Sequence, residues 1–111
     1  MTRLQQQRIT LTDIIFNIAD AAGKLNYYLV LDYCRRCEDC AIGHDRSAHK
    51  EARAVDVVLY HKATGAVCDA RTPEGAAVFS ALHDVADSWG AAKRIPGDLG
   101  HFSVADAGQV R

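Results

Sequence analysis

The chain has 111 residues, of which 49 % are hydrophobic and 24 % are charged. This composition is typical of one compact globular domain and excludes a disordered chain, a collagen-like repeat and a coiled coil. Thirteen basic against fourteen acidic residues give a formal net charge of -1, which does not favour nucleic acid or an anionic membrane as a partner. No apolar run approaches the roughly 20 residues of a membrane span, and no signal peptide is recognisable, so we expect a protein that is made in a cytoplasm.

The first predicted element is a helix. Residues 1–11 are polar and are expected to form an N-terminal arm before a single domain over residues 12–111. From Ile14 to Leu25 the apolar residues recur at helical spacing, and Thr12 is the expected N-cap of that helix.

A strand and a long loop are expected next. The run 26–33 is rich in aromatic and β-branched residues and predicts a buried strand. The stretch from 34 to about 50 is polar and carries charges of both signs. Loops of this length in a small domain are usually functional or pinned by a metal.

The rest of the chain predicts a clear strand with a hairpin partner, a second helix and a last short strand. Residues 54–60 form the clearest strand, and a turn leads from it into residues 66–68 as a hairpin. The segment 72–89 opens with a threonine N-cap and a proline and predicts a helix, with Trp89 in the core. Residues 101–104 predict a last short strand. The order of elements indicates an α+β domain with a small, largely antiparallel sheet and flanking helices.

A carboxylate lies inside the most apolar of these strands. Because side chains alternate along a strand, Asp56 shares a face with Ala54 and Val58. A carboxylate buried there requires a cation. The cation is either a basic side chain, such as Arg53 or Lys50, or a metal ion.

Two histidines near the ends of predicted strands complete a possible metal site. His49 precedes one strand, His101 opens another, and together with Asp56 they match the two imidazoles and one carboxylate of a catalytic zinc site. Such a site needs a general base close to the metal, and Asp98 lies three residues before His101. Residues three apart in a regular strand point to opposite faces, but glycines on both sides of Asp98 permit a turn that brings both groups together.

These residues resemble those of a known family of zinc peptidases. The pattern Ser47-x-His49, six further residues, Asp56 and later Asp98-x-x-His101 is similar to that of D-Ala-D-Ala carboxypeptidases and L-alanyl-D-glutamate endopeptidases. This family shares its fold with the hedgehog signalling domain. The order of the elements extends the resemblance over roughly residues 10 to 105.

Residues around the two halves of the motif also match the family pattern, with one departure. The alanine two residues before Asp56 is also typical of the family, whereas Ala52 replaces a glycine that family members commonly have. Trp89-Gly90, a basic stretch and Asp98-x-x-His101 followed by phenylalanine look like the closing segment of phage lysis endopeptidases. No HExxH zinc-protease motif is present.

The resemblance implies a site and a reaction. It implies that a catalytic zinc is held by His49, Asp56 and His101. It implies further that Asp98 is the catalytic acid and base, that Arg35 or Arg36 holds the substrate or the developing oxyanion, and that Ser47 contributes to substrate binding. The implied function is hydrolysis of a peptide bond in bacterial peptidoglycan. The implied protein is a monomeric phage endolysin that leaves the host cytoplasm to act on the cell wall.

The cysteines depart from the family pattern. Three of them form Cys34-x-x-Cys37-x-x-Cys40, and Cys68 follows at a distance. They suit a structural zinc site with four thiolates, which would pin the long loop. The alternatives are disulfides formed after release, or free thiols. An iron–sulfur cluster is less well matched, because Cys40 is not followed by the fourth cysteine of the ferredoxin pattern.

Two other classes of function stay open. One is a non-catalytic zinc-binding module on the same fold, and the other is a small interaction protein organised by the cysteines. His44 is close enough to the cysteines to serve as a reserve ligand. His61 and His83 are not expected to be ligands, since His83 is predicted to lie on a solvated part of the second helix.

Overall fold

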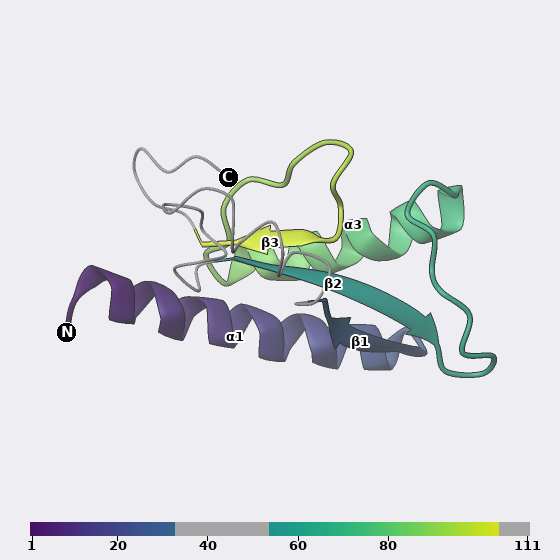
Figure 1. Cartoon of the computed structure of the whole chain (residues 1–111), viewed down its shortest axis with the longest axis horizontal. Coiled ribbons are helices and arrows are strands. Elements are labelled where there is room, and N and C mark those ends of the chain that lie inside the picture. The colour runs from purple at the N-terminus through teal and green to yellow at the C-terminus, as the bar shows by residue number, and fades with distance from the viewer. Residues whose placement is uncertain (33–53, 105–111) are drawn as a thin grey trace, which may run out of the picture.

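The computed structural model describes residues 1–32 and 54–104, which form two helices and a three-stranded sheet. The elements shown in Figure 1 are α1 (Arg3–Lys24), β1 (Tyr27–Leu31), β2 (Ala54–His61), α3 (Pro73–Ser88) and β3 (His101–Ser103). The strands lie in the order β1-β2-β3 and both pairs are antiparallel. The predicted α+β class and antiparallel sheet are confirmed.

The register of the sheet places two polar residues opposite each other. The central strand β2 pairs along its second half with β1, from Val57 to His61. The short strand β3 pairs only with the first three residues of β2, and in this pairing Asp56 lies opposite His101. Figure 1 shows β3 beside the beginning of β2, at the end of a long loop that leaves α3.

One face of the sheet packs against both helices. Because side chains alternate along strands, Val55, Val57 and Leu59 share a face of β2, and Phe102 joins them as the register partner of Val55. These side chains form one core with apolar residues of the helices: Leu11, Ile14, Ile18, Ala22, Phe79, Leu82 and Ala86. Asp56 and its register partner on β3 therefore belong to the opposite face of the sheet.

The first helix starts ten residues earlier than the sequence predicts, since its N-cap is Thr2 and not Thr12. Its N-cap is Thr2, whose hydroxyl accepts a hydrogen bond from the backbone N–H of Gln5, while the Gln5 side chain accepts one from Thr2. This capping box satisfies backbone donors at the helix start. Residues 1–11 are therefore not an arm, and Leu11 is part of the core. The predicted N-cap Thr12 lies within the helix.

The second helix begins where the sequence predicts. The Thr72 hydroxyl accepts from the backbone N–H of Gly75, and a proline follows as the first helical residue. The expectation that Trp89 lies in the core is wrong, since it is the C-cap of the helix and is 47 % exposed. The predicted hairpin strand after β2 is reduced to one bridge between Tyr60 and Val67. Neither helix in the described part of the chain is long and apolar enough to cross a membrane.

Candidate metal centre

Three side chains from two strands and a loop converge at the start of β2. Asp56, Asp98 and His101 each offer one ligand atom, and these atoms all lie within 4.8 Å of one another. The Oδ1 atom of Asp56 lies 3.3 Å from Nδ1 of His101. The two residues face each other because they are register partners in adjacent strands. The described residues thus contain a group that could hold a metal ion.

Two successive turns bring Asp98 to this group, as the flanking glycines predict. The carbonyl of Ile95 accepts a hydrogen bond of 3.1 Å from the N–H of Asp98, and Gly97 between them has a φ of 81°. Proline followed by a residue with positive φ is typical of a type II turn, which explains Pro96-Gly97. The carbonyl of Asp98 then accepts from the N–H of His101 at 3.2 Å. The second turn places both side chains on one side of the loop.

Gly100 closes the second turn against β2. Its carbonyl accepts a hydrogen bond of 2.8 Å from the N–H of Val57. A Cβ atom on Gly100 would lie 2.9 Å from the carbonyl oxygen of Val57, which is closer than side-chain carbons normally approach. Only glycine therefore lets the loop lie this close to the strand.

The variant Gly100→Ala is expected to lower the free energy of unfolding by about 1–3 kcal/mol, the usual effect of forcing extra volume into a packed site. Urea denaturation monitored by circular dichroism measures this loss. Gly23→Ala is the matched control, because the added methyl group meets only the end of the flexible Lys62 side chain, 3.7 Å away. Alanine also favours the helix there. Equal stability of the two variants would contradict the close approach.

Burial and charge both favour a cation at this centre. Asp56 is 4 % exposed and His101 is 5 % exposed, while Asp98 is partly buried. Two carboxylates so close together repel each other when both are ionised. Carboxylate and imidazole groups that converge in this way are ligands that divalent metal ions accept.

The spacing of the ligand atoms suits a small divalent ion. Zinc lies about 2.0–2.2 Å from nitrogen and oxygen ligands, so two ligands of a tetrahedral site lie about 3.4 Å apart. The separation of 3.3 Å between Asp56 Oδ1 and His101 Nδ1 is close to that value. A metal ion could replace their direct contact with little movement of either strand.

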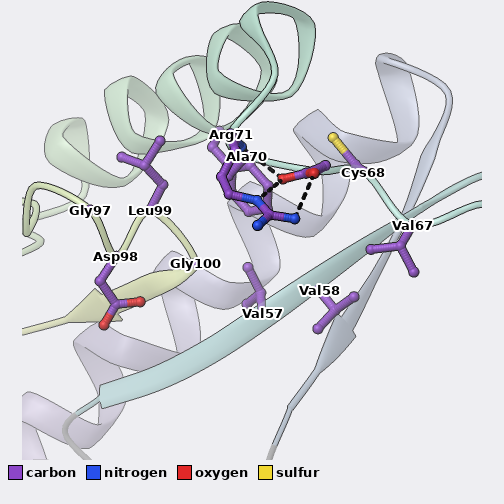
Figure 2. Close-up of a pocket in the computed structure, with 12 residues that line it drawn as sticks. Val57, Val58, Val67, Cys68, Ala70, Arg71, Gly97, Asp98, Leu99 and Gly100 are labelled. Atoms are coloured by element: carbon purple, nitrogen blue, oxygen red, sulfur yellow. Dashed lines mark hydrogen bonds and ion pairs between the residues drawn. The ribbon is translucent and has the colours of Figure 1, made fainter.

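A pocket of ≈ 530 Å³ adjoins the centre. Figure 2 shows Asp98 at one end of this pocket, Val67 and Cys68 at the other, and Arg71 between them above Val57 of β2. Arg71 binds both carboxylate oxygens of Asp69 at 3.1 Å, and these hydrogen bonds hold the pKa of Asp69 below its ordinary value. The pocket therefore extends from Asp98 along valine residues of β2 to the ion pair of Asp69 and Arg71.

Cys68 also lines the pocket and is a free, buried thiol. Burial raises the pKa of Cys68 above its ordinary value, although a hydrogen bond with Tyr27 opposes this effect. In the absence of a metal, burial thus favours the neutral thiol over the thiolate. Its proposed partners Cys34, Cys37 and Cys40 lie outside the described residues, so the structural zinc site stays a prediction.

Several other predicted site residues also lie outside the described residues. They are Arg35, Arg36, His44, Ser47, His49, Lys50 and Arg53. Their roles as ligands, substrate-binding groups or ion-pair partners stay predictions. Among the described residues, Asp56 contacts His101, a second member of the group that could hold a metal ion.

His83 differs from its predicted environment. It is 2 % exposed, and its Nε2 atom donates a hydrogen bond of 2.7 Å to the carbonyl of Leu99. Burial lowers the pKa of His83 below its ordinary value, so the ring is neutral at pH 7. The expectation of a solvated position is wrong, because α3 turns this side chain toward the sheet.

The described residues thus provide an Asp-Asp-His group, with Asp56 and His101 buried and Asp98 partly buried, that could hold a metal ion beside a pocket. No family model matches the chain, and no curated protein matches it.

Proposed function

We propose that the chain is a zinc-dependent peptidase that hydrolyses a peptide bond in bacterial peptidoglycan. One observation carries this proposal: Asp56, Asp98 and His101, which are far apart in the sequence, converge within 4.8 Å. The zinc-peptidase resemblance independently assigns these three residues to one active site. The substrate and the phage endolysin type derive from that resemblance alone.

Asp56 and His101 act as metal ligands in this proposal, and His49 supplies the third protein ligand. The backbones of Asp56 and His101 are fixed by the pairing of β2 with β3, so the geometry of these two ligands exists before the metal binds. One oxygen and two nitrogen ligands leave a fourth position open, as catalytic zinc sites require.

When bound, zinc supplies a Lewis acid that polarises the scissile carbonyl and lowers the pKa of a water molecule. Asp98 accepts the proton of the attacking water and then delivers it to the leaving amine. Its position supports this role, since it lies within 4.8 Å of the ligand atoms and also lines the pocket. Arg35 or Arg36 stabilises the negative charge that develops on the carbonyl oxygen.

The pocket provides a place for the substrate beside these groups. Val58 and Leu99 offer apolar contacts for small side chains such as alanine. Asp98 lines the same pocket. A short peptide with small side chains is the kind of substrate that this surface accommodates.

A non-catalytic zinc-binding module is the second candidate. The proximity of the Asp98 carboxylate to the other two ligand atoms is equally compatible with Asp98 as a direct metal ligand. In that arrangement no carboxylate of the group is left to transfer protons. The protein would then bind zinc without turnover.

Digestion of purified peptidoglycan tests the proposed function. The protein, loaded with zinc, is incubated with sacculi of different stem-peptide compositions, and the soluble fragments are weighed by mass spectrometry. We expect peptide fragments whose masses identify one hydrolysed amide bond. A chelator should stop their release and added zinc should restore it. Stoichiometric zinc binding without fragments from any sacculus would favour the non-catalytic module.

A further inference from the structure

His83 contacts the segment that carries two members of the candidate metal centre. Its ring lies on the inner side of α3, where only 2 % of the residue is exposed. The Nε2 atom is 2.7 Å from the carbonyl oxygen of Leu99, which lies between Asp98 and His101 in the sequence. A carbonyl can only accept, so the Nε2 atom of His83 carries the proton.

The same ring also contacts the residue that follows His101. The rings of His83 and Phe102 are stacked, with centroids 4.1 Å apart and an interplanar angle of 13°. Phe102 is nearly fully buried and belongs to the main core. His83 therefore holds the chain on both sides of His101, by a hydrogen bond before it and a ring contact after it.

The beginning of the loop is attached to the same helix. Arg94 donates hydrogen bonds to Asp84 at 3.0 Å and to Asp87 at 2.8 Å, and both acceptors lie on α3. Its other terminal nitrogen reaches the Ser80 hydroxyl at 3.3 Å. Helix α3 thus holds the loop at two points: through Arg94 near its start and through His83 between Asp98 and His101.

We propose that His83 is a positioning residue for the metal centre: its hydrogen bond to Leu99 and its contact with Phe102 fix Asp98 and His101 relative to Asp56. This role rests on the proposed metal centre. The side chain touches neither metal nor substrate, so its influence passes through the backbone of the loop and β3. Groups that orient metal ligands in this way commonly change metal affinity by 10- to 100-fold.

Two variants separate the hydrogen bond from the ring contact. His83→Phe keeps an aromatic ring beside Phe102 but removes the donor to Leu99. His83→Gln keeps a donor of similar reach but removes the ring. Thr72→Ala is the control, because it removes the N-cap of the same helix, costs about 1 kcal/mol of stability and leaves the loop contacts unchanged.

The full chain and each variant are titrated with Co²⁺, whose visible absorption reports ligand geometry, and with Zn²⁺ in competition. We expect His83→Phe to bind Co²⁺ 10- to 100-fold more weakly with an altered absorption spectrum. The glutamine variant should recover part of the affinity, and Thr72→Ala should match the unmodified chain. Thermal unfolding by circular dichroism verifies that each variant is folded at the titration temperature.

Unchanged Co²⁺ affinity and spectrum in His83→Phe would overturn the positioning role while leaving the metal centre intact. Absence of metal binding by the unmodified chain would overturn the metal centre and the positioning role together. If the phenylalanine variant does not fold, the glutamine variant decides. A shifted Co²⁺ spectrum in His83→Gln then supports the role, and a spectrum identical to that of the unmodified chain contradicts it.

Discussion

His101→Ala is expected to remove stoichiometric zinc binding and to abolish peptidoglycan hydrolysis. The imidazole is 5 % exposed and lies 3.3 Å from the Asp56 carboxylate, so its removal takes away a nitrogen ligand and leaves a void in the site. Three protein ligands are typical of catalytic zinc, and two hold it far less tightly. Metal analysis after dialysis, together with fragment release from sacculi, measures both losses.

A control variant tests whether the loss of zinc is specific to the candidate ligands. His61→Ala removes a histidine that lies at the other end of β2, beside the ring of Tyr27. It should retain full zinc content and activity. His49→Ala should lose zinc as His101→Ala does, if His49 is the third ligand. Unchanged zinc content in both His49→Ala and His101→Ala would refute the assigned ligand set.

The sequence predicts the elements whose signals are local. The strand over residues 54–60 and the Thr72-Pro73 start of α3 depend on neighbouring residues, and both are confirmed. The early start of α1 also had a local signal, since Thr2 and Gln5 have the spacing of a capping box. The polar composition of residues 1–11 favours an arm instead, and composition alone therefore gives the wrong prediction for this segment.

The environment of His83 could be predicted from helical spacing. The buried residues Phe79, Leu82 and Ala86 recur every three or four positions, and His83 falls on the same face. A polar side chain on that face needs a partner, and the carbonyl of Leu99 supplies it. The identity of this partner is not predictable from the sequence, because it depends on how a distant loop packs against α3.

The convergence of Asp98 with His101 is the part of the site that sequence reasoning predicts best. The glycines around Asp98 indicate a turn, and the turn forms with a positive φ at Gly97. The pairing of Asp56 with His101 is not predictable in the same way, because register between strands far apart in the sequence is set by the whole core. The sequence alone also leaves open whether Asp98 binds the metal or transfers protons.

The variant Asp98→Asn distinguishes these two roles. As a general base, Asp98 lies close to the metal without binding it, so the asparagine variant should keep both zinc and fold. Turnover on peptidoglycan should then fall by a factor of about 10² or more, the usual contribution of acid–base catalysis. The loss should appear in kcat rather than in KM, because the carboxylate acts in the transition state and not in substrate binding.

The other roles of Asp98 predict different results. If the carboxylate is a direct ligand, Asp98→Asn should lose zinc affinity together with activity. If Asp98 only forms the turn, asparagine serves equally well and turnover should stay nearly normal. Asp13→Asn on the exposed face of α1 controls for the loss of one negative charge. Retained zinc with kcat lowered about 100-fold, beside an Asp13→Asn variant of normal activity, is the combination that a general base produces and the other two roles do not.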